Sequence, residues 1–169
     1  RRTTLVEAMR AEADRLGVER IWARVEGLTQ DAAGVQLQCA WGDAVYADYV
    51  LACDGLHSTI ARELGVAQQR SGRMRRYGLR QHFYCAPWSS MIEVHYAGDA
   101  EIYITPVSSD TVGVAVLGPK GINLEQTIAR VPELHTRLTG AAQASSLRGA
   151  GPFNYRVRRA QVGRVLLVG

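Results

Sequence analysis

The chain has 169 residues, of which 47% are hydrophobic and 21% are charged, and its formal net charge is +4. This composition is typical of a globular protein, and it excludes collagen-like chains and chains too poor in apolar residues to fold. No apolar run approaches the roughly 18 residues of a membrane-spanning helix, and the basic residues are not interleaved with aromatic ones. We therefore expect neither an integral membrane span nor a nucleic-acid partner.

The first predicted element is a helix that begins at a capping box over residues 4–7 and ends at Gly17. Its apolar residues recur at helical spacing, so we expect an amphipathic helix. Two strands are predicted next, at residues 18–25 and 35–39, and a turn at residues 41–43 leads into a further strand. This order predicts a β-meander.

The most informative stretch covers residues 47–64, which read ADYVLACDGLHSTIAREL. Its apolar beginning is typical of a parallel-sheet strand that is covered on both faces. Asp54 and Gly55 end this strand, and ligands of open α/β sheets bind beyond the carboxyl ends of strands. Ser58 is placed to cap a short helix that Gly65 ends. A plain Asp-Gly turn explains the same residues.

The second half of the chain is rich in short strands. Five arginines between residues 70 and 80 form either a solvated connector or a phosphate-binding patch. Strands joined by short connections then predict an antiparallel sheet. The predicted elements are strands at 79–85, 91–96, 101–105 and 111–117, a helix from Asn123 that Pro132 breaks, a shorter helical piece at 134–138, a linker at 141–146, a further strand of the same sheet at 153–157, and a parallel-type strand at 165–168.

The cysteines Cys39, Cys53 and Cys85 are odd in number and widely spaced. This spacing fits neither a disulfide framework nor a zinc site. Thiols in a reducing compartment are the default, which predicts a cytoplasmic protein. The sequence indicates no metal site.

The residues after the apolar strand resemble the DG motif of the FAD-dependent monooxygenase superfamily, the para-hydroxybenzoate hydroxylase-like group with geranylgeranyl reductase-like and flavin halogenase members. The residues at the motif positions are Asp54, Gly55, Ser58 and Arg62. The opening residues RRTTL resemble the family's Arg-x-x-Leu helix start, and residues 163–169 resemble the strand that delivers its GD motif. The acidic residue of that motif and the glycine-rich phosphate loop are not in this sequence, so we expect an internal fragment.

The resemblance implies an α/β (α+β) fold, with part of an FAD-binding Rossmann-like domain and an antiparallel-sheet substrate domain of para-hydroxybenzoate hydroxylase type. We expect residues 1–74 to belong to the FAD-binding domain, residues 75–160 to form the substrate domain, and residues 161–169 to return to the first. The implied cofactor is FAD, whose binding is expected to need sequence missing from this chain. The sequence leaves the oligomeric state open.

The resemblance also implies an activity. NAD(P)H would reduce FAD, oxygen would form a flavin hydroperoxide, and a small organic substrate would be hydroxylated. Two alternatives stay open: a geranylgeranyl reductase-like enzyme that saturates isoprenoid double bonds, and a binding module without redox chemistry. A serine hydrolase is disfavoured, because the sequence has no G-x-S-x-G elbow.

The resemblance and the strand pattern together predict the site residues. The predicted cofactor-binding residues are Arg1, Arg2, Asp54, Gly55, Ser58, Arg62, Pro106 and Gly169. The predicted substrate-facing residues are Arg80, His82, Tyr84, Tyr103 and Thr105, each set lying on one face of its strand. The first three of these equally fit a solvated sheet face, and Pro106 equally fits a turn at the end of a strand. No catalytic residue is assigned.

Overall fold

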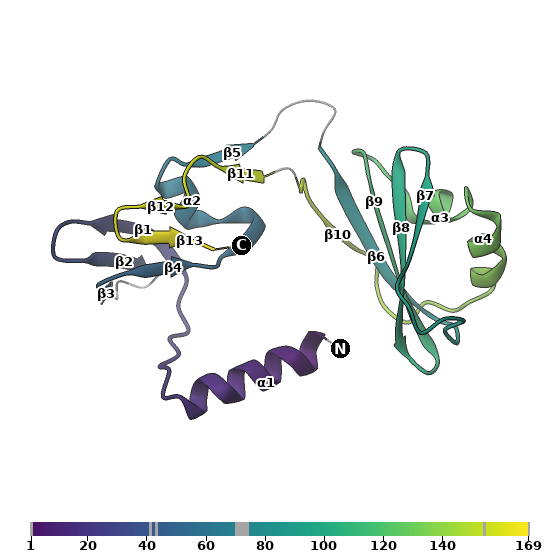
Figure 1. The fold of residues 1–169 in the computed structure, drawn as a ribbon, viewed down its shortest axis with the longest axis horizontal. Helices are drawn as coiled ribbons and strands as arrows, with labels where there is room; N and C mark the ends of the chain where they lie inside the picture. The colour runs from purple at the N-terminus through teal and green to yellow at the C-terminus, as the bar shows by residue number, and fades with distance from the viewer. Residues whose placement is uncertain (1, 41, 43, 70–74, 154, 169) are drawn as a thin grey trace. The chain divides into compact units, whose positions relative to one another are not determined.

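The computed structural model describes residues 2–40, 42, 44–69, 75–153 and 155–168 (Figure 1). The chain divides into two compact units. The first comprises the chain up to Ala67 together with the chain from Val157 onward, and the second spans Gln68–Arg156. The second unit is therefore inserted between two stretches of the first. The functional boundaries after residues 74 and 160 stay predictions.

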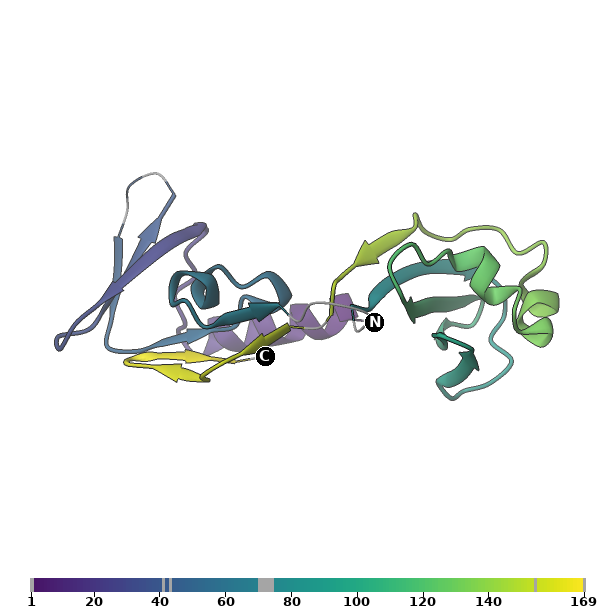
Figure 2. The ribbon, with the colours of Figure 1, turned by 90° about the horizontal axis from the view of Figure 1, so that it is seen from above.

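The first unit contains two small sheets and two α-helices (Figures 1 and 2). Its elements are α1 (Arg2–Arg15), β1 (Val25–Gln30), β2 (Val35–Cys39), β3 (Ala44–Ala47), β4 (Val50–Ala52), the 3₁₀ turn η1 (Gly55–His57), α2 (Thr59–Glu63), β12 (Gln161–Val162) and β13 (Val165–Leu167). Strands β1, β2 and β3 form the predicted antiparallel meander. Strand β4 belongs to a different sheet, in which it pairs in parallel with β13.

The predicted strand at residues 18–25 is wrong, because regular pairing begins only at Val25. Val25 lies opposite Cys39, the last residue of β2, so the preceding residues have no partner strand along β2. Ile21 and Trp22 are accordingly exposed, at 56% and 81%. A segment does not form a regular strand when the neighbouring strand is too short to pair with it.

The parallel pairing of β4 and β13 confirms the sheet type predicted for both strands. Val50 lies opposite Val165, and Ala52 lies opposite Leu167. Burial on both faces is not found, because Leu51 is 65% exposed whereas Val165 is fully buried. The buried cluster of this unit lies on one face of the sheet only.

Helix α1 differs from its prediction in two ways. It begins at Arg2, so Thr4 lies inside the helix and cannot be its N-cap. None of its described residues is buried, and the apolar side chains of Leu5 and Met9 are 61% and 64% exposed. The predicted end is confirmed, because Gly17 has a positive φ of 76° just after the last helical turn.

A polar clasp joins the meander to the hairpin of β12 and β13. The side chain of Gln30 donates from Nε2 to the carbonyl of Val162 at 3.2 Å, and its Oε1 accepts from the amide of Arg164 at 2.9 Å. The guanidinium of Arg164 donates to the carbonyl of Ala32 at 2.7 Å and to that of Asp48 at 3.2 Å. Residues more than a hundred positions apart in the sequence are thereby held together.

We expect Gly163→Ala to lower the free energy of unfolding by about 2–3 kcal/mol, through the strain of a left-handed residue and the loss of a hydrogen bond. Gly163 has φ +57°, and an added Cβ would lie 2.4 Å from Oε1 of Gln30. The matched control is Gly65→Ala, with φ +65° and open space around the new Cβ. Urea denaturation of both variants measures the difference, and equal losses would show that the clasp contributes nothing.

The second unit is a five-stranded antiparallel sheet with two short helices on one face (Figures 1 and 2). Its elements are β6 (Tyr77–Tyr84), β7 (Glu93–Ala97), β8 (Ala100–Ser108), β9 (Thr111–Gly118), α3 (Leu124–Ile128), α4 (Pro132–Leu138) and β10 (Arg148–Ala150). The strand order is β10-β6-β9-β8-β7. Except for β10, these elements agree with the predicted strands and helices, and the predicted hairpin corresponds to β7 and β8.

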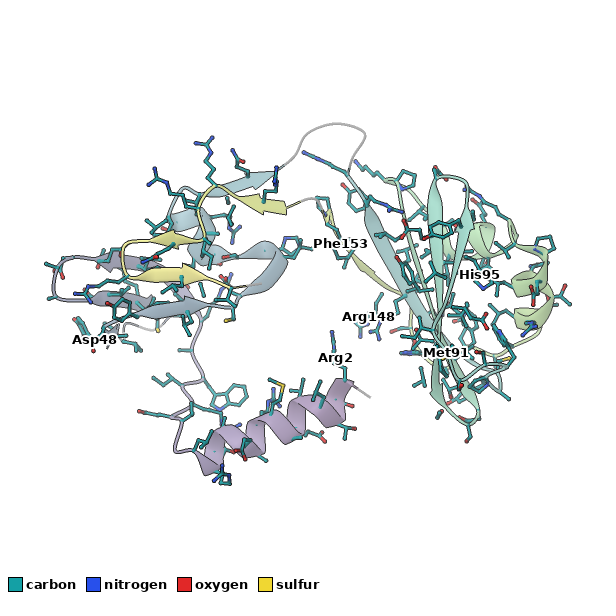
Figure 3. All side chains as sticks on the ribbon, viewed as in Figure 1. Arg2, Asp48, Met91, His95, Arg148 and Phe153 are labelled. Atoms are coloured by element: carbon teal, nitrogen blue, oxygen red, sulfur yellow. The ribbon has the colours of Figure 1, made fainter. Side chains whose placement is uncertain are left out.

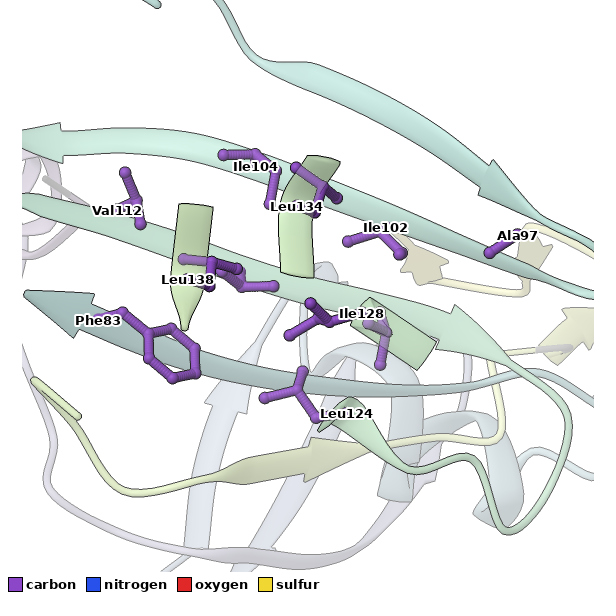
Figure 4. Close-up of a cluster of buried hydrophobic side chains, with 11 residues drawn as sticks. Phe83, Ala97, Ile102, Ile104, Val112, Leu124, Ile128, Leu134 and Leu138 are labelled. Carbon is purple, nitrogen blue, oxygen red and sulfur yellow. The ribbon is translucent and has the colours of Figure 1, made fainter. Parts of the chain in front are cut away.

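The core of the second unit lies between the sheet and the two helices. Leu134 and Leu138 of α4 pack among strand residues such as Ile104 and Val112 (Figure 4). Helix α3 begins as predicted, since the Asn123 side chain accepts from the amide of Gln126 at 2.9 Å. Helix α4 begins two residues earlier than predicted, because Pro132 lies in its first turn, where a proline needs no intrahelical partner for its nitrogen. The opposite face of the sheet carries the predicted substrate-facing residues.

The strand predicted at residues 153–157 forms, but not in the predicted sheet. Strand β11 (Tyr155–Val157) pairs with β5 (Ala67–Gln69) in a separate two-stranded sheet. The position beside β6 is occupied instead by β10. Phe153 then lies across Gly78, where an added Cβ would meet its ring at 3.0 Å (Figure 3).

The small residues at 141–146 run along β6 rather than forming a simple linker. The amide of Ala144 donates to the carbonyl of His82, and the amide of Tyr84 donates to the carbonyl of Ala142, both at 2.8 Å. Among the helices in the described part of the chain, none has the length and apolar character needed to cross a membrane.

Candidate functional site

The DG turn follows directly from the end of β4. Asp54 Oδ2 accepts hydrogen bonds from the amides of Thr59 at 2.7 Å and Ile60 at 3.2 Å, which are the first residues of α2. Gly55 has φ +73°, and nothing lies within 4 Å of the place that a Cβ would occupy. The glycine therefore permits both a left-handed turn and close approach from outside.

Ser58 and Arg62 complete the same turn. The Ser58 hydroxyl accepts from the amide of Ala61 at 2.9 Å, which confirms the predicted N-cap. Arg62 donates to the Ser58 carbonyl at 3.2 Å and to the Thr59 hydroxyl at 3.1 Å. The four motif residues thus lie together, and three of their side chains bind the backbone or side chains of the turn itself.

The carboxyl of Asp54 is held in its charged form. Partial burial raises its pKa, but hydrogen bonds from the Ser58 side chain and from the amides of Ile60, Asp54 and Thr59 outweigh burial and bring the pKa below its ordinary value of 3.8. A charged carboxylate at the N-terminus of α2 also suits the helix dipole. The geometry gives Asp54 the role of fixing the shape of the turn.

The carboxyl ends of two parallel strands meet beside this turn. The amide of Val168, just after β13, donates to the carbonyl of Ala52 at the end of β4 at 2.9 Å. Cys53, Asp54 and Gly55 are exposed at this edge. An exposed turn with a freely approachable glycine at the carboxyl edge of a parallel pair fits one side of a dinucleotide site.

The remaining predicted cofactor-binding residues belong to other elements or lie outside the described residues. Arg2 is exposed in the first turn of α1 (Figure 3). Pro106 lies opposite Val112, a core residue, and therefore on the helix-covered face of the second unit's sheet. Arg1 and Gly169 lie outside the described residues.

The predicted substrate-facing residues share the open face of the second unit's sheet. Through β9, Arg80 aligns with Ala115 and Tyr103, and His82 aligns with Gly113 and Thr105. Because residues directly opposite one another in a ladder share a face, the two predicted sets lie together. Tyr84 is on this face as well, two residues beyond His82, and is 58% exposed. Whether they contact substrate stays a prediction.

A glycine in β9 gives His82 a place to lie flat on the sheet. A Cβ built on Gly113 would lie 3.1 Å from Cδ2 and 3.4 Å from Nε2 of the His82 ring. On its other side, Gly113 is flanked by Val107, 3.4 Å from that Cβ. Because Gly113 has no side chain, the imidazole of His82 can lie close to the backbone of β9.

A network that the sequence did not predict extends this face. Arg76 donates to Oε1 of Glu101 at 2.7 Å, and the Tyr103 hydroxyl donates to Oε2 of the same carboxylate. Arg76 also donates to the carbonyl of Leu117 at 2.9 Å. The i, i+2 spacing of Glu101 and Tyr103 on one strand is a signal for part of this network, but the sequence shows Arg76 only as one of the five arginines between residues 70 and 80.

The network shifts the titration of both groups on β8. The Tyr103 hydrogen bond, together with the Arg76 guanidinium, lowers the pKa of Glu101 below its ordinary value of 4.5. The hydrogen bond to Glu101 raises the pKa of Tyr103. Tyr103 is therefore held as a protonated phenol, and its hydroxyl proton is already donated to Glu101.

We expect Glu101→Gln to lower the free energy of unfolding at neutral pH by roughly 1 kcal/mol, since the partly exposed network loses its charge. Because the folded pKa of Glu101 is lowered, its stabilisation is fully present above pH 4.5 and is lost as the pH falls through the folded value. The difference between parent and variant should therefore shrink under acid. Urea denaturation from neutral to acid pH tests this, with exposed Glu125→Gln as control; a pH-independent difference would contradict it.

A half-open cavity of about 450 Å³ lies elsewhere in the first unit, between the β1–β2 turn and the end of β3. Its lining includes Asp31, Tyr46 and Asp48, but none of the predicted site residues. The carboxylate of Asp31 already accepts from the amides of Ala33 and Gly34. The candidate residues therefore remain two separate groups, the DG turn of the first unit and the open sheet face of the second unit.

Comparison with protein families finds one match over nearly the whole chain. The sequence profile of the family described as "FAD binding domain" matches residues 2–169. No curated protein sequence matches the chain significantly.

Solved structures share the fold of this chain. The flavin-dependent halogenase CmlS is 20% identical with a TM-score of 0.82, over 94% of this chain and 32% of its own. The flavin-dependent brominase Bmp2 is 19% identical with a TM-score of 0.84, over 100% and 48%. The halogenase PltM, in complex with phloroglucinol and FAD, is 13% identical with a TM-score of 0.73, over 88% and 36%.

The chain spans between a third and a half of the length of these structures. The shared fold covers both units, which confirms the predicted combination of a partial nucleotide-binding domain and an antiparallel sheet. At these identities the likeness concerns the fold alone.

Proposed function

Because the chain belongs to the FAD binding domain family, we propose that it forms part of an FAD-dependent monooxygenase that hydroxylates a small organic substrate. The observation that carries this proposal is the DG turn at the carboxyl edge of the parallel pair β4–β13. The proposed reductant is NAD(P)H. The free cysteines suit a cytoplasmic location, which we propose as well.

The DG turn would contact the cofactor mainly through its backbone. The Asp54 carboxylate is engaged with the amides of α2, so it shapes the turn rather than transferring a proton. Gly55 leaves the outer side of the turn open to a phosphate or ribose. When bound, reduced FAD would supply the activation of oxygen, and the protein supplies binding and orientation.

The open sheet face would orient the substrate. Arg80 and His82 offer a cation and an imidazole, and Tyr103 and Thr105 lie on the neighbouring strand across β9. Such a surface can hold a polar organic molecule by hydrogen bonds and ring contacts. Because the Tyr103 proton is committed to Glu101, its hydroxyl oxygen would act as an acceptor towards substrate.

The reductase alternative has less structural support. It rests on the resemblance of residues 101–106 to a strand of the geranylgeranyl reductase-like members, and Tyr103 and Pro106 of this segment lie on opposite faces of the sheet. Halogenation is a further outcome to test, because similar folds carry it in CmlS and Bmp2.

The test uses the protein expressed from the complete gene. We expect it to purify with bound FAD, to consume oxygen when NAD(P)H and a substrate are supplied, and to add one oxygen atom to that substrate. Reactions are run with and without chloride and bromide, and in the absence of oxygen. A halogenated product, or anaerobic reduction of an alkene, would replace the monooxygenase proposal, and a protein that binds no flavin would overturn it.

A second measurement concerns the 169-residue chain itself. We expect it to bind FAD weakly or not at all, because it has no G-x-G-x-x-G phosphate loop. Titration of the flavin absorbance measures this. A chain that purified yellow, with stoichiometric flavin, would show that the described edge is sufficient.

A further inference from the structure

The two edges of the second unit's sheet differ in how they are protected. One edge is β10, three residues long. The other is β7, five residues long, which pairs with β8 in a regular ladder and, among the described strands, with no other. Natural proteins protect edge strands from pairing with other chains by lysine, proline, β-bulges or covering segments. Strand β7 contains no lysine, no proline and no β-bulge.

The β7 edge also carries apolar side chains on the open face. Ile92, just before the strand, is 63% exposed, Val94 is 42% exposed and Tyr96 is 78% exposed. Met91 precedes them and is 70% exposed (Figure 3). We use the name β7 edge for the outer side of this strand together with the row of exposed side chains Ile92, Val94 and Tyr96. An unpaired backbone beside exposed apolar residues is a template for another strand.

The other face of β7 carries a carboxylate and an imidazole two residues apart. The Glu93 carboxylate accepts from Trp88 Nε1 at 3.1 and 3.0 Å and lies 3.2 Å from His95 Nε2 (Figure 3). The two side chains are 29% and 23% exposed. They are fixed close to the edge, and neither is buried.

The sequence of β7 is complementary to itself in one antiparallel register. If two copies pair about a two-fold axis at Val94, Glu93 of each copy lies opposite His95 of the other, and Ile92 lies opposite Tyr96. Acid then faces base on one side of the joined sheet, and β-branched residues face an aromatic on the other. A shift by one residue would place every side chain on the wrong face.

From this register we propose that the β7 edge binds the β7 edge of a second copy of this chain, joining two five-stranded sheets in a homodimer. The interface is isologous, so it closes at two copies. It is also small, so the dimer should form only at higher protein concentration. This proposal is independent of the proposed function.

The first test is sedimentation velocity of the 169-residue chain over a range of concentrations. We expect the mass to rise from 18.5 kDa towards twice that value. Val94→Lys places like charges together at the axis, and it should weaken dimerisation at least tenfold. The control is Tyr84→Lys, which adds the same charge to the same sheet face on β6, where Tyr84 is 58% exposed, and it should leave dimerisation unchanged.

A cross-linking test does not depend on the charge variant. In a Cys53→Ser background, which removes the exposed native thiol, oxidised Val94→Cys should form a disulfide-linked dimer because residue 94 meets its own copy. Leu147→Cys, 49% exposed beside the opposite edge, is the control and should stay uncross-linked. Circular dichroism confirms that each variant folds.

The proposal would be overturned by a chain that stays monomeric at every concentration, by dimerisation equally sensitive to the Tyr84 and Val94 variants, or by equal cross-linking at residues 147 and 94. A mass that continues to grow beyond two copies would do the same, since it would show open-ended association.

Discussion

Replacing Ile102 with alanine should lower the free energy of unfolding of the second unit by about 2–5 kcal/mol, the range found for large-to-small changes in packed cores. Ile102 lies near the start of β8, is fully buried, and belongs to the cluster between the sheet and helices α3 and α4 (Figure 4). The substitution would leave a cavity lined by buried residues of the same cluster, among them Val116, which lies opposite Ile102 on β9. Removing the side chain therefore costs both burial and packing.

The measurement can be confined to the second unit. In a Trp22→Phe, Trp41→Phe background, Trp88 is the remaining tryptophan of the chain. Its indole is held by Glu93 and by the Arg137 guanidinium 4.7 Å above the ring, so its fluorescence reports the folded state of this unit. Leu147→Ala, 49% exposed, is the control and should change stability by about 0.5 kcal/mol or less. Similar losses for both variants would contradict the assigned core.

Asp54→Ala is the variant with the largest expected effect on the candidate site. Without the carboxylate, the amides of Thr59 and Ile60 lose their acceptor, which should destabilise the first unit by about 1–2 kcal/mol. If the turn supports FAD, its loosening should weaken FAD binding by the complete protein roughly tenfold or more, since 1.4 kcal/mol corresponds to a factor of ten. Isothermal titration with FAD measures this.

The acid dependence of Asp54 provides a second measurement. Its folded pKa lies below 3.8, so its contribution is present above that pH and is lost as the pH falls through the folded value. The difference between parent and Asp54→Ala should therefore vanish under strong acid. Asp48→Ala is the matched control, because Asp48 is bound through its backbone carbonyl. Unchanged FAD affinity in Asp54→Ala would exclude the DG turn from the cofactor site.

Local signals in the sequence predicted the elements of the candidate site well. The turn residue Gly55 and the cap Ser58 act through neighbouring backbone, so their spacing contains the information that is needed. The alternation of Arg80, His82 and Tyr84 on one face was likewise predictable, because it follows from the two-residue period of a strand.

Pairing partners were harder to predict because they depend on distant residues. The sequence predicts a strand at residues 18–25, yet β2 is short, so regular pairing begins only at Val25, preceded by a hydrogen bond from the amide of Ala40 to the carbonyl of Arg24. The sequence does not predict strand β10, because Gly149 and Ala150 are poor strand formers. These residues form a strand through their pairing with β6. The Arg76–Glu101 pair escaped prediction for the same reason, since it joins residues 25 positions apart.

Because the first unit is made of two separate stretches of the chain, the two units can fold at different times during synthesis. The second unit is continuous in sequence and has all its strands once Arg156 has emerged, so it can fold while synthesis proceeds. Strand β4 must wait for β13, because its parallel neighbour Val165 is translated more than a hundred residues later. Until then β4 has no parallel neighbour, and the edge that carries the DG turn is the last part of the described fold to be assembled.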